Sequence, residues 1–273
     1  MNDPAGFIPT YNEYQVQRWA TGNAAEAKDR VAEELPLSLV YNGMPHVVMM
    51  ATPADLEDFA LGFCLSEGIL SNPSQLYATE VTPLAEGVQV QMDIDLERFL
   101  PLEDQRRNLA GRTGCGLCGA ETMEQAVRHP TPVGAGVTIT AAALQKALSR
   151  LAEQQALNAI TGAVHAAAWA TLDGELVLVR EDVGRHNALD KMIGAVVRSG
   201  NSFDSGFALI TSRASFEMAQ KAATVGISLL AAISAPTGLA IRLAQETQLT
   251  LIGFARSGQF NVYANPQRVR ASA

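Results

Sequence analysis

The sequence predicts an α/β fold, with a three-layer sandwich over residues 130–268 and a smaller α+β part before it. Strand-like and helix-like segments alternate from about residue 160 to residue 265, which indicates a largely parallel sheet covered by helices on both faces. Asn42-Gly43 separates two β-rich segments, which is typical of a hairpin. Hydrophobic residues make up 48% of the chain and charged residues 18%, so intrinsic disorder is excluded.

The chain divides into three predicted parts. Residues 1–30 form an N-terminal extension, residues 31–129 form the α+β part, which ends in a loop with two cysteines, and residues 130–268 form the α/β domain. We expect a hairpin from Leu35–Tyr41 and Met44–Met50.

A helix is predicted after this hairpin. Thr52 is the expected N-cap, Pro53 the first helical residue and Gly68 the stop signal. Cys64 falls on the apolar face of this helix and is predicted to be a core residue. A strand follows at Val88–Ile94, and the polar stretch 100–114 is predicted to be a mobile loop.

The second half begins with an amphipathic helix that Thr140 caps and that runs through Leu151. The strands expected after it are Leu176–Arg180, Phe207–Thr211, Ile227–Ile233, Leu249–Phe254 and Phe260–Tyr263. The helices expected between them are His186–Arg198, Ser215–Thr224 and Thr237–Gln245.

Charge and hydropathy exclude several classes of protein. The formal net charge is −8, which argues against nucleic-acid binding because phosphates require a basic face. No apolar run of about 18 residues occurs, and the first residues do not form a secretory signal. We therefore expect a soluble cytoplasmic protein that binds neither nucleic acid nor membrane. Its three cysteines do not predict a disulfide framework.

Two of the cysteines form the motif Cys115-Gly-Leu-Cys118, flanked by glycines and followed by a predicted helix start. A cysteine at a helix N-terminus has a lowered thiol pKa, and Arg112 adds a positive charge. These features suit a nucleophilic thiol. Two other interpretations stay open: half of a structural zinc site, although no second CxxC or spaced histidine pair follows, and a redox dithiol, although a polar loop rather than a strand precedes it.

A second chemically dense stretch, E-D-V-G-R-H-N-A-L-D-K, covers residues 181–191. It lies where a predicted strand ends and a helix begins, the usual place for ligands in open α/β sheets. Glu181, Asp182, Arg185 and His186 either bind a ligand or form a capped turn with an internal salt bridge. His165, among small apolar residues, is more typical of a core histidine than of a site.

Polar residues also follow three later strands. Residues 212–221, 234–238 and 253–260 carry Arg, Ser, Thr and Gly at successive strand ends, which suggests a site for a phosphorylated ligand. For residues 253–260 taken alone, a plain hairpin turn between two strands is an equally open interpretation. The last 74 residues have a net charge of +3 in an otherwise acidic chain. The basic residues that we expect to contribute are Arg213, Lys221, Arg242 and Arg256.

Taken in order, G-C-G-L-C-G, T-G-A-V-H-A-A-A, E-D-V-G-R-H-N-A-L-D-K, S-R-A-S-F-E-M, S-A-P-T-G-L-A and G-F-A-R-S-G-Q-F-N-V-Y closely resemble the formate dehydrogenase accessory sulfurtransferases, the FdhD family. The resemblance covers roughly residues 35–268. It implies a sandwich similar to the cytidine deaminase fold and a homodimer. Ala163 stands where many members have Gly, which leaves the implied function undisturbed.

The resemblance also implies an activity in molybdenum cofactor biosynthesis. Family members take sulfur from a cysteine desulfurase as a cysteine persulfide and pass it to the bis-molybdopterin guanine dinucleotide cofactor, which then serves formate dehydrogenase. Cys115 matches the persulfide-bearing cysteine and Cys118 its companion, which either holds the sulfur transiently or releases the donor through a disulfide. The segment matching the cofactor-binding loop consists of Phe254, Ala255, Arg256, Ser257, Gly258 and Gln259. No metal ligand set is implied.

Two rival functions remain. A zinc-dependent nucleoside deaminase requires a histidine followed two residues later by a catalytic glutamate, whereas Ala167 stands at that distance from His165. A cofactor chaperone with purely structural cysteines would keep full activity as a Cys115→Ala variant.

Overall fold

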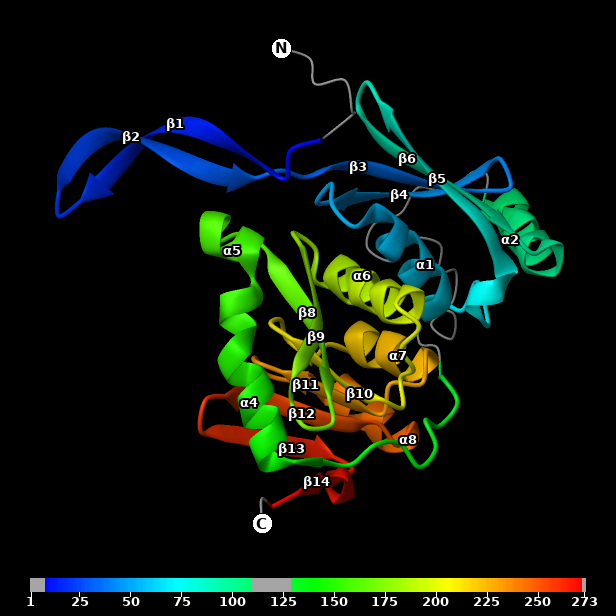
Figure 1. The fold of residues 1–273 in the computed structure, drawn as a ribbon. Helices are drawn as coiled ribbons and strands as arrows, with labels where there is room; N and C mark the ends of the chain where they lie inside the picture. The colour runs from blue at the N-terminus through cyan, green and yellow to red at the C-terminus, as the bar shows by residue number, and fades with distance from the viewer. Residues whose placement is uncertain (1–7, 110–128, 272–273) are drawn as a thin grey trace.

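A computed structural model describes residues 8–109 and 129–271 of the chain. At their centre is a six-stranded sheet in the order β13-β12-β11-β10-β8-β9 (Figure 1). Its strands are β8 (His165–Thr171), β9 (Leu176–Asp182), β10 (Gly206–Ile210), β11 (Leu229–Ala232), β12 (Thr250–Arg256) and β13 (Gln259–Ala264).

The pairing within this sheet is mixed. Strand β11 pairs parallel with both of its neighbours, β10 and β12. The pairings β10–β8, β8–β9 and β12–β13 are antiparallel. The prediction of a largely parallel sheet was therefore wrong. Short turns join β8 to β9 and β12 to β13, and such turns permit only antiparallel neighbours.

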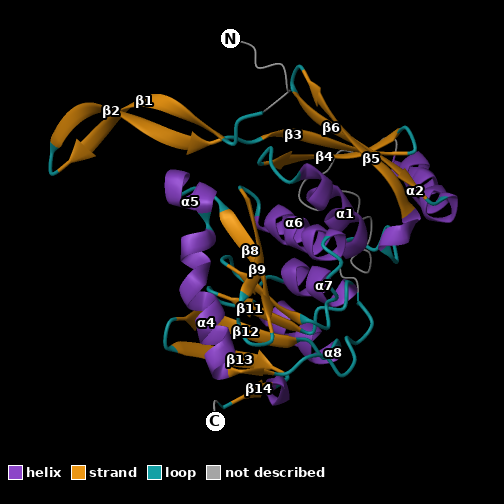
Figure 2. Ribbon diagram, in the orientation of Figure 1, coloured by secondary structure: helices purple, strands orange, loops and turns teal. Residues whose placement is uncertain are grey.

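Helices cover both faces of this sheet (Figure 2). Alternate residues point to opposite faces of a strand: Ala208 and Ile210 belong to the core beneath α6, α7 and α8, whereas Phe207 and Leu209 belong to the core beneath α4. The helices are α4 (Ala141–Leu151), α6 (Arg185–Arg198), α7 (Phe216–Thr224) and α8 (Gly238–Glu246). The helix–sheet–helix arrangement is confirmed, and its likeness to the cytidine deaminase fold stays a prediction.

A four-stranded sheet, in the order β4-β3-β6-β5, packs against the same core through helix α1. These elements are β3 (Leu35–Tyr41), β4 (Met44–Ala51), α1 (Leu56–Ser66), β5 (Leu76–Leu84) and β6 (Gly87–Ile94). Helices α1 and α6 touch through their backbones, because a Cβ atom at Gly62 would lie 1.7 Å from the carbonyl oxygen of Asp190. The core is thus continuous across residue 130, and the division into predicted domains remains a proposal.

Several local predictions are confirmed. The hairpin of β3 and β4 turns at Asn42-Gly43, and Cys64 is fully buried. Thr140 caps α4, since its hydroxyl oxygen accepts a hydrogen bond from the backbone N–H of Ala143 at 3.1 Å.

Two local predictions were wrong. Helix α1 starts at Leu56 rather than after Thr52, because the Thr52 hydroxyl accepts a hydrogen bond from the distant Val183 N–H instead. Residues 96–109 form helix α2 (Leu96–Leu109), where a loop was predicted from residue 100. Leu102 and Phe99 pack this helix against the core. The remainder of the predicted loop, residues 110–114, lies outside the described residues.

The extension contains an element that the sequence reasoning missed. Strands β1 (Tyr11–Ala20) and β2 (Asn23–Ala32) form a two-stranded hairpin that projects from the body of the molecule (Figure 1); we call residues 11–32 the arm. Shorter elements complete the described chain: α5 (Ala156–Thr161), β7 (Ile139–Thr140), β14 (Val269–Arg270) and three 3-10 turns. Among the described residues, no helix is long and apolar enough to cross a membrane.

Candidate functional site

The ends of β10, β11 and β12 meet at one edge of the six-stranded sheet. The loops after β10 and β11 are joined, because the Thr237 N–H donates to the Ala214 carbonyl oxygen at 3.0 Å. The Phe254 N–H donates to the Ser234 carbonyl oxygen at the same distance. The three polar segments predicted from the sequence therefore lie side by side. We call residues 211–215, 234–237 and 254 the strand-end edge.

The N-terminus of α6 reaches this edge. His186 Nε2 on α6 lies 2.7 Å from Glu217 Oε2 on α7. Arg185 Nε and Ser215 Oγ are buried atoms without a hydrogen-bond partner among the described residues. In neither α6 nor α7 does an N-cap side chain accept a hydrogen bond from the backbone N–H groups of the first turn. These N–H groups and the guanidinium of Arg185 favour a negatively charged ligand.

Two histidines flank this edge. His165 begins β8, and its neighbour Ala166 donates its N–H to the Thr211 hydroxyl at 2.9 Å. Burial and the positive charge of Arg185 lower the pKa of His165. Burial also lowers the pKa of His186, and this effect exceeds the opposing influence of Glu217. Both rings are therefore neutral at pH 7 and can accept a proton or a hydrogen bond.

Residues 181–191 divide between structure and edge. Asp182 and Lys191 form a fully buried ion pair at 2.7 Å. The Lys191 ammonium also donates to the Thr52 carbonyl oxygen, and the Glu181 carboxylate accepts two backbone N–H bonds at the start of α5. These groups therefore lock β9, α5 and residue 52 together. The side chains of this stretch that remain at the edge are those of Arg185 and His186.

Lys221 was expected to face an anion, and the structure shows that it does not. Its ammonium lies 2.9 Å from Asp190 Oδ2 and 2.7 Å from Glu67 Oε1, in the core between α1, α6 and α7. Burial raises the pKa of Asp190 to about 6, and its partners raise the pKa of Lys221 against the effect of burial. Both groups are consequently charged at pH 7. Arg213, Arg242 and Arg256 are exposed, as a ligand-binding role requires.

The turn 254–259 begins within a bulge in β12. The pairing register with β13 shifts between Gly253 and Arg256, and Phe254 adopts a left-handed backbone with φ of 50° and an exposed side chain. Bulges of this kind re-aim side chains and occur next to sites. Five of the six predicted binding residues are exposed, whereas the Ala255 side chain lies in the core beneath α4.

A residue on α4 fixes the tip of this turn. The Gln145 side chain accepts from the Gly258 N–H at 2.7 Å and donates to the Arg256 carbonyl oxygen at 3.1 Å. Sequence reasoning missed Gln145, because no sequence signal indicates that α4 packs beside this turn. It also gave Glu217 no role, because no sequence signal pairs that residue with His186.

The predicted catalytic residues Cys115 and Cys118 lie outside the described residues. The described chain stops at Leu109 and resumes at His129, whose Nδ1 atom is 3.0 Å from Glu246 Oε2 on α8. Within the described ranges, no group of three or more His, Cys, Asp or Glu side chains could hold a metal ion.

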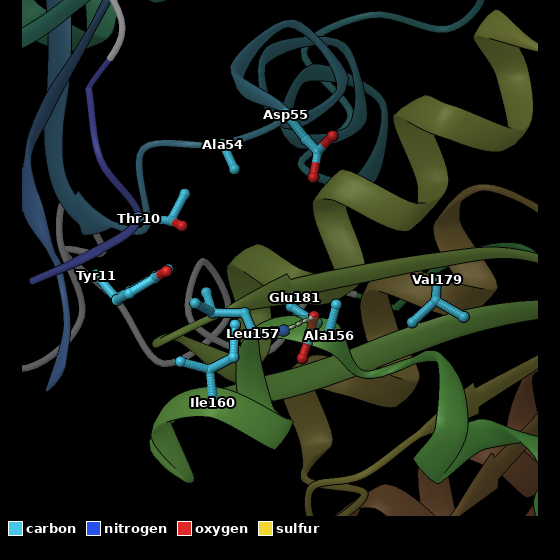
Figure 3. A pocket seen from close by; sticks show the side chains of 9 residues that line it. All are labelled: Thr10, Tyr11, Ala54, Asp55, Ala156, Leu157, Ile160, Val179 and Glu181. Carbon is cyan, nitrogen blue, oxygen red and sulfur yellow. Dashed lines mark hydrogen bonds between the residues drawn. The ribbon is translucent and has the colours of Figure 1, made fainter. Parts of the chain in front are cut away.

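A hollow of about 230 Å³ lies away from the turn 254–259, between the base of the arm, α5 and the start of α1 (Figure 3). Its lining is mostly apolar, and its two carboxylates already have partners: Asp55 lies 3.4 Å from Arg180, and Glu181 holds α5. Tyr11, from the first strand of the arm, points into it. We interpret the hollow as the seat of the arm.

Comparisons with known proteins identify the family of this chain. The family model described as the FdhD/NarQ family matches residues 32–270. The chain belongs to the FdhD/NarQ family. The resemblance inferred from the six sequence motifs is thereby confirmed.

The chain is similar to named members of this family along most of its length. It is 53% identical over 265 residues to the sulfur carrier protein FdhD of Cupriavidus necator, covering 97% of this chain and 92% of the relative. It is 54% identical to that of Xanthomonas euvesicatoria, covering 93% and 90%. A crystal structure from Desulfotalea psychrophila, described as a formate dehydrogenase accessory protein, has a TM-score of 0.78 at 22% identity and covers 96% of this chain and 100% of its own. That likeness supports the fold alone.

Proposed function

We propose that the protein is a sulfurtransferase that carries sulfur from a cysteine desulfurase to the bis-molybdopterin guanine dinucleotide cofactor for formate dehydrogenase. The observation that carries this proposal is the match, over more than nine-tenths of the chain, to relatives named sulfur carrier proteins, in a chain that contains Cys115-Gly-Leu-Cys118. A cysteine pair between glycines is the part of this sequence best suited to carry sulfur.

The first chemical step is a thiol exchange. The Cys115 thiolate attacks the terminal sulfur of the donor's persulfide, a new S–S bond forms on Cys115, and the donor cysteine leaves as a thiolate. No external electrons are needed, because one S–S bond replaces another. If Cys118 then attacks Cys115, the terminal sulfur leaves as hydrosulfide and a Cys115–Cys118 disulfide forms, which supplies the two electrons of the release.

The cofactor is a substrate in this scheme, and its nucleotide end carries phosphates. The strand-end edge suits such groups, since Arg185 and the first turns of α6 and α7 supply positive charge and N–H donors. The turn from Phe254 to Gln259, exposed at every residue except Ala255, is the proposed contact for the guanine dinucleotide part. His186, neutral and beside Glu217, can accept a hydrogen bond or a proton at the same edge.

Intact-protein mass spectrometry after incubation with a cysteine desulfurase and cysteine tests this function. The wild-type protein should gain about one reducible sulfur atom per chain, and Cys115→Ala should lose that gain. Cys118→Ala should still accept sulfur, because the first step uses Cys115 alone. Absence of any gain in the wild-type protein would reject sulfur carriage, and full activity of Cys115→Ala would favour a cofactor chaperone.

A further inference from the structure

The strand pairing beneath the turn 254–259 is interrupted. Strands β12 and β13 pair as far as Gly253↔Asn261, and the pairing resumes only at Arg256↔Gln259. The extra residue of a bulge is left without a ladder partner, so the hairpin has fewer backbone hydrogen bonds here than a regular one. Within its own hairpin, a single residue pair therefore closes the tip.

The link between the two strands is not one of the favoured hairpin turns. It consists of Ser257 and Gly258, and of the two only Gly258 has a positive φ, of 84°. The two-residue turns whose twist matches paired strands need a positive φ at both positions, as in type I′, or at the first, as in type II′. This turn is of neither type, so we expect contacts from outside the hairpin to help fix its conformation.

Gln145 on α4 supplies such a contact. Its carboxamide accepts a hydrogen bond from the Gly258 N–H at 2.7 Å and donates one to the Arg256 carbonyl oxygen at 3.1 Å. A carboxamide can donate and accept at once, as the peptide group of a neighbouring strand does. Gln145 thus acts as a substitute for a backbone partner at the tip, while the side chains of Arg256 and Ser257 stay exposed.

Helix α4 is a firm support for this contact. It lies beside β12 (Figure 1), and the Thr140 side chain caps its N-terminus. Leu144, the residue before Gln145, is fully buried and belongs to the same core as Ala255 of the turn. The helix and the turn therefore share one core, and the half-buried Gln145 joins them above it.

We propose that Gln145 is a positioning residue, which holds the turn 254–259 in the conformation that binds the guanine dinucleotide part of the cofactor. This inference rests on the proposed function, because that function assigns the cofactor to this turn. A turn that is already ordered loses less conformational entropy when its ligand binds. If only a fraction of the molecules has the binding conformation, the dissociation constant rises by the inverse of that fraction. Gln145 thus raises the affinity without touching the ligand.

Hydrogen exchange at the Gly258 amide measures the contact in the full-length protein. Gln145→Met keeps the length of the side chain but removes its donor and its acceptor, so this amide should exchange at least about threefold faster than in the wild type. The matched control is Lys146→Met, which instead removes an ion pair with Glu175 at 2.7 Å and should leave the exchange at Gly258 unchanged. Equal exchange rates in Gln145→Met and the wild type would overturn the proposal.

The affinity for GDP tests the positioning role. GDP contains guanine and a diphosphate, and titration calorimetry measures its dissociation constant. Gln145→Met should raise this constant at least about threefold, whereas Lys146→Met should match the wild type. In sulfur delivery, the cofactor concentration at half-maximal rate should rise by the same factor, and the maximal rate should stay unchanged because the turn is ordered once the ligand is bound. A residue that only stabilises the fold would change neither quantity.

Failure of this inference and failure of the proposed function give different results. Sulfur loading by a cysteine desulfurase does not use the turn, so the wild type, Gln145→Met and Lys146→Met should load equally. Absence of loading in the wild type rejects sulfur carriage, and the comparison of GDP affinities keeps its meaning. Wild-type affinity for GDP in Gln145→Met, or no binding of GDP by the wild type, would overturn the role assigned to Gln145.

Discussion

Residues 181–191 contain two groups of side chains that differ in what they do. Asp182 and Lys191 are fully buried and paired with each other at 2.7 Å. Arg185 and His186, only a few residues away, reach the strand-end edge, where Arg185 Nε has no described partner. We call Asp182 and Lys191 the scaffold half of this motif, and Arg185 and His186, for which we propose a role toward the ligand, its site half. The ion pair of the first group is fully buried in the core, whereas the second group lies near the surface, with His186 beside the half-exposed Glu217 and Arg185 Nε without a described partner.

The largest effect should come from breaking the scaffold half. Lys191→Met leaves the Asp182 carboxylate buried without its counter-charge, which should lower the free energy of unfolding by about 3–5 kcal/mol. Urea denaturation measures this loss. Lys146→Met removes a lysine that pairs with Glu175 on the surface and should cost no more than about 1 kcal/mol. Equal losses in the two variants would contradict the assignment.

A smaller loss is expected at the other end of this network. Thr52→Val keeps the volume of the side chain but leaves the Val183 N–H without the hydroxyl oxygen that accepts its hydrogen bond at 3.1 Å. The expected cost is about 1–3 kcal/mol, measured by the same denaturation. Ser257→Ala, in an exposed turn, should stay within about 0.5 kcal/mol of the wild type. A Thr52→Val variant as stable as that control would remove Thr52 from the network.

The site half should reveal itself through pH. Burial lowers the pKa values of His165 and His186, so the unfolded chain binds more protons than the folded one as the pH falls through the ordinary histidine range. The free energy of unfolding should therefore decrease between pH 7.5 and 6, and a His165→Gln/His186→Gln variant should flatten that slope.

Asp190 acts in the opposite direction. Its pKa, raised to about 6, means that the folded state takes up a proton before the unfolded state does. This stabilises the fold as the pH falls toward 4. Asp190→Asn should remove this stabilising proton uptake, so the free energy of unfolding should fall more steeply below pH 6 than in the wild type. For the histidines, the contradicting result is a His165→Gln/His186→Gln variant whose free energy of unfolding falls as steeply as that of the wild type between pH 7.5 and 6. The two rings would then not titrate as described.

The smallest effect on stability is expected at Arg185. Because its buried Nε atom has no described partner, Arg185→Gln breaks no described hydrogen bond and should lower the free energy of unfolding by no more than about 1 kcal/mol. Thermal and urea unfolding both measure this. A loss as large as that of Lys191→Met would place Arg185 in the scaffold.

The sequence predicted the parts of the fold in which local signals and packing agree. Asn42-Gly43 gave the hairpin turn, and the alternation after residue 160 gave the strands and helices that carry the edge. Strand β8 was missed because HAAAWAT is rich in alanine, which has little strand propensity. The arm was missed because both of its faces are exposed and its strands lack an apolar alternation.

The same limit applies to the site. Arg185, His186 and the turn 254–259 could be selected from the sequence, since they follow strands and carry suitable chemistry. Their partners could not, because His186 and Glu217 are brought together by the packing of α6 on α7. Lys221 is not available to a ligand, because it pairs with Asp190 and Glu67. This pairing could not be predicted, since it depends on the packing of α1, which is more than 150 residues earlier in the chain.

The most direct test of the central claim separates sulfur loading from sulfur delivery. Wild-type, Arg185→Gln and Lys146→Gln proteins are each loaded by a cysteine desulfurase, and formate dehydrogenase activity is then reconstituted with the cofactor. Arg185→Gln should load as much sulfur as the wild type but deliver it at least about tenfold more slowly, because a charge-assisted contact to the cofactor is lost. Lys146→Gln should match the wild type in both steps. Delivery by Arg185→Gln at the wild-type rate would contradict the assignment of the strand-end edge as the place where the cofactor receives its sulfur.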